Sequence, residues 1–463
     1  MELITQHPLK IGLEIHCYLN TQEKLFCKCS TSEFDEPNSN ICPICTGTPG
    51  SKPMLVNKEA IKKLIQVSLI LNCKIEEEKD LIFQRKHYNW PDLPKGFQNT
   101  ISGAHCSFPA YKGNFKGINI WECHLEEDPA QWNPENGHIN YNRSGLPLVE
   151  VVTAPDFKKV DEVISWLKSF ILSLSYIKAI KKNAGIKVDV NISTYGERVE
   201  IKNLNSLDKI QKAINYEISR QLDANKNNEK IIQETRRYDE SKGKTIRMRT
   251  KENAQDYRFI PDPDLPIMKL NSDFVQEIKK ALPETPDEKL KKLLLIYEVE
   301  KSDAQIIMKN LELVEFFEEL AKEGIDVKKN LSWITIELLR ILNYNKKTLD
   351  DSDIDIKPNH LAELINLVEK KELTTLKAKQ IMNDFIPKSF SIKEKKDIFK
   401  IAEDAVQNIC QKVIEQNPKA VQDYKEGQEN SLNFLIGQVM KQSQRRADFK
   451  LAKEELEKIL KKE

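Results

Sequence analysis

The chain has 463 residues, of which 40% are hydrophobic and 31% charged, so its composition is that of a globular protein and excludes wholesale disorder. Lys and Arg number 72 against 71 Asp and Glu, so bulk charge indicates no polyanionic partner, and any nucleic-acid surface must be a local patch. No stretch approaches the ~18–20 apolar residues of a membrane span, and the N-terminus lacks signal-peptide features. We expect a soluble, cytoplasmic protein of two or three domains.

The part of the chain before Pro286 is dense in Gly and Pro and alternates short β-branched runs with turn clusters. The runs at 9–19, 186–193 and 197–203 predict strands. Apolar residues at helical spacing predict helices at 59–72 and 207–223. We therefore expect residues 1–285 to form a mostly antiparallel β domain with inserted helices.

Only three Gly and three Pro follow Pro286, and apolar residues then recur at helical spacing. Helices are expected to open near Pro286 and Ser302, where cap-type residues precede acids. Further predicted helices cover 310–324, 332–343, 359–371 and 429–442. The predicted fold class is thus α+β: a β domain (1–285), followed by an all-α helical domain (286–390) and a helical tail module (391–463).

Four cysteines form two closely spaced pairs. Cys27-Lys28-Cys29 and Cys42-Pro43-Ile44-Cys45 are separated by twelve residues and supply the four thiolates that a closed tetrahedral zinc site requires. The alternative is four reduced cysteines that merely pack. Paired knuckles favour the metal, so the sequence predicts a structural zinc knuckle.

Three predicted strands carry polar side chains two residues apart, and such residues share one face of a strand. The pairs are Glu14 with His16, Asp189 with Asn191, and Glu200 with Lys202. A solvated sheet face would give the same pattern on any one strand. Three such strands together with an acidic run at 126–128 favour a concave polar site, and oxygen ligands with one imidazole suit Mg²⁺ or Mn²⁺.

The segment 83–98 places Arg85, Lys86, His87 and Lys95 around two aromatics and a Pro-stiffened turn. Such a loop could hold a triphosphate or could be a basic surface loop, and the residues alone leave both readings open. No P-loop, dinucleotide-binding or zinc-protease motif occurs, and nothing resembles a glutaminase nucleophile. If this protein uses ammonia as a substrate, another subunit must therefore generate that ammonia.

Taken together, the motifs of this chain resemble those of a known family. IGLEIH, the four cysteines, RKHYNWPDLPKGFQ, HLEED, YNRSGLPLVEVVTAPD, RVEIKNLNS, QETRRYDESKGKT and DYRFIPDPDLP occur in the order seen in the B subunits of heterotrimeric Asp/Glu-tRNA(Asn/Gln) amidotransferases. The C-terminal NFLIGQVMKQS resembles the tail module of that family, so the resemblance runs from about residue 10 to the end.

The resemblance implies a cradle domain that binds ATP and Mg²⁺, with the structural Zn²⁺, ahead of the helical and tail domains. It implies a ligase that phosphorylates the side-chain carboxylate of Glu or Asp on a misacylated tRNA. Ammonia from an amidase-type A subunit then displaces phosphate, and a small C subunit completes the heterotrimer.

The resemblance also implies roles for particular residues. The catalytic positions fall on Glu14, His16, Glu126, Glu127 and Glu200. Adjacent Glu126 and Glu127 cannot both point inward from a strand. We therefore expect Mg²⁺ to be bound by Glu14, His16, Glu127 and Glu200, with Glu126 in a supporting or substrate-binding role.

Further positions are expected to bind phosphate or the aminoacyl end: Arg85, Lys86, Lys95, Asp189, Asn191, Lys202 and Asn203. Those expected to bind the tRNA body are Lys441, Arg445, Arg446 and Lys450. Residues 182–191 depart from the usual family pattern, which predicts altered nucleotide or substrate contacts.

Two other readings compete with this one. A zinc-containing RNA-binding module without catalysis fits the knuckles and the basic tail, but inward carboxylates would repel phosphate unless a metal intervened. A self-contained metal-dependent hydrolase would turn over without any partner, whereas an amidotransferase subunit needs an ammonia source.

Overall fold

The computed structural model describes residues 9–32, 36–77, 79–103, 106, 108–181, 185–250, 258–392, 403–443, 447 and 449–462. The chain divides into two compact units, Met1–Glu288 and Lys289–Glu463. The first is built on a mostly antiparallel sheet and the second is helical, so the predicted α+β class is confirmed. The domain limits at 285/286 and 390/391 stay predictions. Among the described residues, no helix combines the length and apolarity needed to cross a bilayer.

One sheet dominates the described part of the first unit. Its strands are β1 (Lys10–Tyr18), β2 (Lys74–Ile75), β3 (Gln84–His87), β4 (Phe97–Thr100), β5 (Ala110–Phe115), β6 (Ile118–Glu127), β9 (Pro147–Thr153), β10 (Ile186–Ser193), β11 (Val199–Leu204), β12 (Glu234–Asp239), β13 (Lys244–Thr250) and β14 (Arg258–Pro261). The order is β13-β12-β11-β10-β1-β9-β6-β4-β3-β14, with β5 also on β6 and β2 on β5. Neighbours are antiparallel except β11 and β12, which are parallel. β7 (Gln131–Trp132) and β8 (Ile139–Asn140) form a separate pair.

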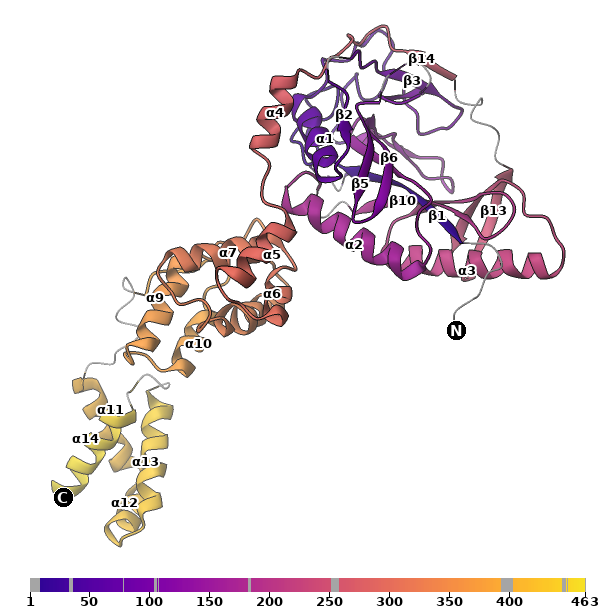
Figure 1. Ribbon diagram of the computed structural model, residues 1–463. Coiled ribbons are helices and arrows are strands. Elements are labelled where there is room, and N and C mark those ends of the chain that lie inside the picture. Colours follow the sequence, from indigo (N-terminus) through magenta and orange to yellow (C-terminus); the bar gives the residue numbers. More distant parts are fainter. Residues whose placement is uncertain are drawn as a thin grey trace. The chain divides into compact units, whose positions relative to one another are not determined.

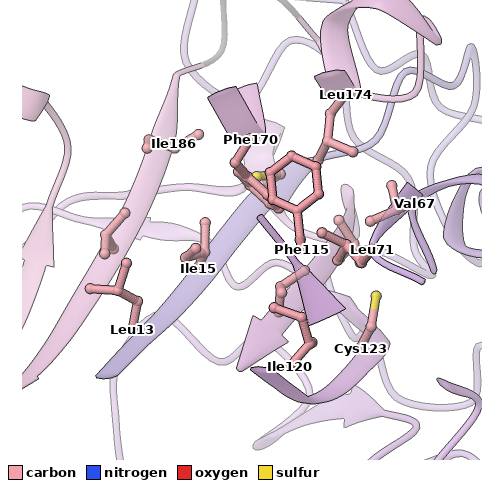
Figure 2. Close-up of a cluster of buried hydrophobic side chains, with 14 of the residues drawn as sticks. Leu13, Ile15, Val67, Leu71, Phe115, Ile120, Cys123, Phe170, Leu174 and Ile186 are labelled. Carbon is pink, nitrogen blue, oxygen red and sulfur yellow. The ribbon is translucent and has the colours of Figure 1, made fainter. Parts of the chain in front are cut away.

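Three long helices pack on the sheet: α1 (Lys58–Ile70), α2 (Val160–Tyr176) and α3 (Leu207–Lys226) (Figure 1). The core lies between them and the sheet, because the strands send alternate apolar side chains to this face. Figure 2 shows Leu13 and Ile15 of β1 and Ile120 of β6 with Phe170 of α2 in this cluster. The polar residues between these apolar positions must therefore occupy the opposite face.

Two short elements complete the first unit. A 3₁₀ turn, η1 (Tyr141–Arg143), precedes β9, and α4 (Ser272–Lys280) packs on α1. The sequence predicts no strand at 258–261, but Arg258–Pro261 form β14 on the edge of the sheet. Pro is tolerated there because an edge strand has a side without hydrogen-bonded neighbours. The predicted helices at 59–72 and 207–223 are confirmed as α1 and α3.

The described residues after Pro286 form helices. They are α5 (Pro286–Leu295), α6 (Lys301–Ile307), α7 (Leu311–Lys322), the π-helical η3 (Trp333–Leu338), α8 (Leu339–Tyr344), α9 (Pro358–Glu369), α10 (Thr375–Asn383), α11 (Glu403–Gln416), α12 (Pro418–Lys425), α13 (Glu429–Gln442) and α14 (Phe449–Lys462). The helices predicted at 310–324, 359–371 and 429–442 correspond to α7, α9 and α13. Helices α11 to α14 share an apolar cluster that includes Cys410, Leu435, Val439 and Leu456.

Candidate active site

Polar side chains from several strands meet on the face of the sheet that the helices leave open. Directly opposed residues of antiparallel strands share a face, so the register shows which ones are neighbours. The opposed pairs are Glu14 with Asp189, Asn191 with Glu200, His16 with Glu150, and Glu150 with His124. A continuous polar band thus crosses β11, β10, β1, β9 and β6.

One group in this band, the histidine–glutamate cluster, consists of His16, His124, Glu126 and Glu150. The Nε2 atom of His16 lies 3.4 Å from Oε2 of Glu150 and 3.8 Å from Oε2 of Glu126. The Nε2 atom of His124 lies 3.2 Å from Oε2 of Glu150 and 3.6 Å from Oε1 of Glu126. Donor atoms of His16, Glu126 and Glu150 lie within 4.8 Å of one another, close enough to share one cation.

The charges of this cluster favour ionised carboxylates. Burial raises the pKa of Glu150, but His16 and His124 more than offset this, and that pKa lies well below its usual range. Burial likewise lowers the pKa of His124, but Glu150 and Glu126 outweigh it and raise the pKa to about 10. The pKa of His16 is also raised, because Glu150 and Glu126 outweigh its burial. The cluster therefore attracts positive charge, whether as protons or as a metal.

A second group, the carboxylate–lysine cluster, consists of Glu14, Asp189, Glu200 and Lys202. The ammonium Nζ of Lys202 lies 2.6 Å from both Asp189 Oδ2 and Glu200 Oε1, and 3.9 Å from Glu14 Oε2. These three acids outweigh the burial of Lys202 and hold its pKa well above the usual range. The ammonium thus neutralises a group of carboxylates whose oxygens could otherwise hold a metal ion.

The surrounding hydrogen bonds orient these carboxylates. Asn191 Nδ2 donates to Glu14 Oε1 at 2.9 Å, and the backbone N–H of Asn203 donates to Asp189 Oδ1 at 2.8 Å. The hydroxyl of Thr235 donates to Glu200 Oε2 at 3.2 Å. Asn191 and Asn203, both expected to bind substrate or phosphate, therefore contact the acids of this cluster.

Glu126 and Glu127 point to opposite sides of β6, as adjacent residues of a strand do. Glu126 points to the open face beside the histidines, as its position two residues after His124 requires. Glu127 points the other way, where it pairs with Lys95 and accepts the N–H of Asn99 at 2.9 Å. Among the described residues, Glu127 joins no candidate metal group. The structure thus brings Glu14 and Glu200 together, places His16 with Glu126, and leaves Glu127 apart from both groups.

Sequence reasoning also missed His124 and Glu150 as site residues. Both lie in motifs quoted for the family resemblance, HLEED and PLVEVVT, but neither was singled out. Two local signals were available: His124 stands two residues before Glu126, and Glu150 is a lone acid in an otherwise apolar strand. Their proximity to His16 depends on strand register, which the local sequence does not give.

The cations expected to bind phosphate each have an acidic neighbour. Arg85 donates to Asp262 and to Asp264 at 2.9 Å, and its guanidinium lies 4.4 Å from the ring centre of Phe97. Lys86 Nζ lies 3.8 Å from Oε1 of Glu126, at the edge of the histidine–glutamate cluster. Lys86 is therefore the cation of this segment that borders the cluster, while Arg85 is neutralised by the two aspartates.

The four cysteines predicted to form a zinc knuckle lie together. Their sulfur atoms are within 4.8 Å of one another, and none forms a disulfide. The backbone N–H of Cys42 donates to Cys45 Sγ at 3.2 Å, and Lys24 Nζ lies 3.6 Å from the same sulfur. A hydrogen bond from Cys27 and the charge of Lys24 lower the pKa of Cys45 to about 5, which favours a thiolate. The donor set therefore fits one tetrahedral metal ion.

The residues expected to bind the tRNA body lie at the end of the chain. Lys441 is exposed on α13 and Lys450 is exposed on α14. Arg445 and Arg446 lie outside the described residues, as do residues 182–184 of the segment that departs from the family pattern.

Comparisons with known proteins cover nearly the whole chain. Residues 9–276 match a family model described as the GatB/GatE catalytic domain, and residues 315–460 match one described as the GatB domain. Three relatives are named as the B subunit of an aspartyl/glutamyl-tRNA(Asn/Gln) amidotransferase. They come from Methanocaldococcus jannaschii (40% identical, 97% of this chain and 98% of the relative), Methanobrevibacter smithii (42%, 96% and 99%) and Methanopyrus kandleri (38%, 95% and 96%). The chain belongs to the family of B subunits of aspartyl/glutamyl-tRNA(Asn/Gln) amidotransferases.

Proposed function

We propose that this chain is the activating subunit of a tRNA-dependent amidotransferase. It phosphorylates the side-chain carboxylate of Glu-tRNA(Gln), Asp-tRNA(Asn) or both with ATP, and then amidates the activated carboxylate. The observation that carries the proposal is full-length similarity to curated B subunits together with two groups of buried or half-buried acids on one open sheet face. An amidase-type A subunit supplies the ammonia, and a small C subunit completes the heterotrimer.

The reaction balances as two displacements. A carboxylate oxygen of the substrate attacks the γ-phosphorus of ATP, the bond to ADP breaks, and an acyl phosphate forms. Ammonia then attacks the acyl carbon, phosphate leaves with the bonding electrons, and the nitrogen loses a proton. Phosphorylation is required because a free carboxylate has no leaving group that ammonia can displace.

The residues present fit a divalent cation. His16 Nδ1 is buried without a hydrogen-bond partner, and ionised carboxylates lie beside both imidazoles. Mg²⁺ would be held by His16, Glu126 and Glu150, and a second position by Glu14, Asp189 and Glu200. When bound, it offsets the charge of the triphosphate.

The side chains of the open face have their own roles in this proposal. Lys86 is placed to bind a phosphate oxygen at the border of the histidine–glutamate cluster. Lys202 holds the carboxylates of its cluster in place and can turn its ammonium toward phosphate when a metal binds them. Cys27, Cys29, Cys42 and Cys45 hold a structural Zn²⁺, which anchors the loop between the two knuckles.

The test is reconstitution of the full chain with its A and C subunits, followed by ATP-dependent amidation of Glu-tRNA(Gln) and Asp-tRNA(Asn). The expected result is amidated tRNA and ADP in equal amounts, with no product when either ATP or an ammonia source is omitted. ATP-independent product, or no product from either tRNA in a folded complex, would refute the proposal. Binding of tRNA without ATP hydrolysis would instead indicate an RNA-binding module, although the buried carboxylates on the open face count against it.

A further inference from the structure

The hairpin of β5 and β6 contains an irregularity that changes which side chains reach the open face. Ala110 lies opposite Cys123, and Gly113 lies opposite Ile120, and all four residues are buried. A regular strand has one residue between two successive inward positions, but here each strand has two. The register between β6 and β9 also shifts between Ile120 and the next paired residue. Such bulges re-aim side chains and are common beside active sites.

The extra residues place an aromatic surface on the open face. The intervening residues are Tyr111 and Lys112 on β5, and Trp121 and Glu122 on β6. Trp121 is 55% exposed, although an indole usually gains stability from burial. Two lysine ammonium groups lie near the ring of Tyr111 on β5. Lys74 Nζ is 5.5 Å and Lys112 Nζ is 6.0 Å from the ring centre. Aromatic rings interleaved with lysines are typical of surfaces that bind single-stranded nucleic acid.

This aromatic–lysine surface (Lys74, Tyr111, Lys112 and Trp121) is continuous with the candidate active site. One row of directly opposed residues crosses the sheet from β2 to β10. In order, it consists of Lys74, Tyr111, Glu122, Val152, Glu14 and Asp189. With strands about 4.8 Å apart, the row is about 24 Å long, and Glu122 lies about 10 Å from Glu14. Trp121 adjoins this row, so a chain laid along it would pass the indole before it reaches the carboxylate–lysine cluster.

Glu122, the acid adjacent to Trp121 in the chain, does not close the path to phosphates. Glu122 has its Oε1 3.6 Å from Nδ1 of His124, so its charge is directed into the histidine–glutamate cluster. Val152, the next residue of the row, is half-buried and leaves an apolar step between Glu122 and Glu14.

We propose that the aromatic–lysine surface binds the unpaired 3′ nucleotides of the substrate tRNA, with Trp121 and Tyr111 stacking on bases and Lys74 and Lys112 contacting phosphates. The surface leads the aminoacyl end along the row to Glu14. This inference rests on the proposed function, because it takes a tRNA as the substrate. The open position and the interleaved lysines favour a single strand over the adenine of ATP, and Trp121 acts as a positioning residue.

The experiment uses the full chain in complex with its A and C subunits. It measures equilibrium binding of uncharged tRNA(Gln) and of the same tRNA lacking its unpaired 3′ nucleotides. We expect Trp121→Ala to weaken binding of the intact tRNA by roughly 5- to 100-fold, the scale of one lost base stack, and to leave binding of the shortened tRNA unchanged. Trp121→Phe keeps a stacking ring and should restore most of the difference. Tyr344→Ala removes an aromatic that is 86% exposed in the second unit and is the matched control.

Several results would overturn the inference. Equal losses for both tRNAs, or none for either, would mean that Trp121 does not contact the 3′ end. A higher KM for ATP with unchanged tRNA binding would assign the indole to the adenine of the nucleotide. Weaker assembly with the partner subunits would assign the surface to a protein interface. Failure of the proposed function would look different, because the unmodified complex would then amidate neither tRNA, whatever the Trp121 variants bind.

Discussion

The position of Glu126 gives the sharpest test of the candidate site. Its carboxylate lies 3.6–3.8 Å from His124, His16 and Lys86, while that of Glu127 is turned toward Lys95. A unit charge pair about 3.7 Å apart contributes about 4 kcal/mol at an effective dielectric constant near 20. Glu126→Gln removes these attractions but also removes the cost of burying a charge, so the protein should still fold.

We expect Glu126→Gln to reduce ATP-dependent amidation by roughly 10²- to 10³-fold, the loss that follows removal of one electrostatic stabiliser. Glu127→Gln is the matched control, since it changes the adjacent residue in the same way and its side-chain oxygen can still accept the N–H of Asn99. Its loss should be at least about tenfold smaller. The assay is amidation by the reconstituted complex, with thermal unfolding followed in parallel.

A loss in Glu127→Gln equal to or greater than that in Glu126→Gln would refute this reasoning. It would restore the arrangement expected from the sequence, in which Glu127 contacts the cation. Near-normal amidation by a folded Glu126→Gln protein would remove the histidine–glutamate cluster from the mechanism altogether.

Three further predictions concern metals and tRNA. The divalent-cation affinity of the isolated chain should rise with pH, because the raised pKa of His16 keeps its imidazole protonated at low pH and the cation must displace that proton. Calorimetry in two buffers should detect the released proton, and a pH-independent affinity would contradict the assignment of His16 as a ligand. The double variant Cys42→Ser, Cys45→Ser should lose the binding of about one zinc per chain and be less stable, since a structural zinc contributes on the order of 10 kcal/mol of folding free energy. The control Cys106→Ser should keep its zinc, as measured by elemental analysis, and equal zinc contents in the two variants would count against the knuckle. The double variant Lys441→Ala, Lys450→Ala should bind tRNA more weakly, and the slope of log binding constant against log salt concentration should fall by up to about 0.9 per lost phosphate contact. The control Lys453→Ala, in which the replaced ammonium lies near Glu457, should leave both quantities unchanged. Identical slopes for the double variant and the unmodified chain would exclude Lys441 and Lys450 from the tRNA interface.

Local sequence was enough to find the features whose parts lie close together in the chain. The cysteine knuckles, the alternation of Glu14 with His16, and the helix openings near Pro286 each depend on a spacing of a few residues. Such spacings follow from backbone geometry, so a single sequence reveals them.

Features that depend on strand register could not be found in this way. Glu150 reaches His16 only because β9 pairs with β1 in one register, and a shift of one residue would turn it to the other face. Arg85 meets Asp262 across 177 residues of chain. The sequence therefore showed that carboxylates line a face, while their division into two groups, and the exclusion of Glu127 from both, required the sheet.

Lys202 has a consequence for how the apoprotein folds. Three carboxylates whose oxygens lie within 4.8 Å of one another would repel strongly if they had no counter-charge. If a bound metal were the source of that counter-charge, the site would be destabilised when the metal was removed. The ammonium of Lys202 provides that counter-charge from within the chain, 2.6 Å from two of the acids. The sheet can therefore fold at any Mg²⁺ concentration, and chelation of Mg²⁺ should abolish the activity of this site without unfolding the protein. At the cysteine knuckle, where the ammonium of Lys24 lies 3.6 Å from one of the four sulfurs, removing the metal should instead loosen the local structure.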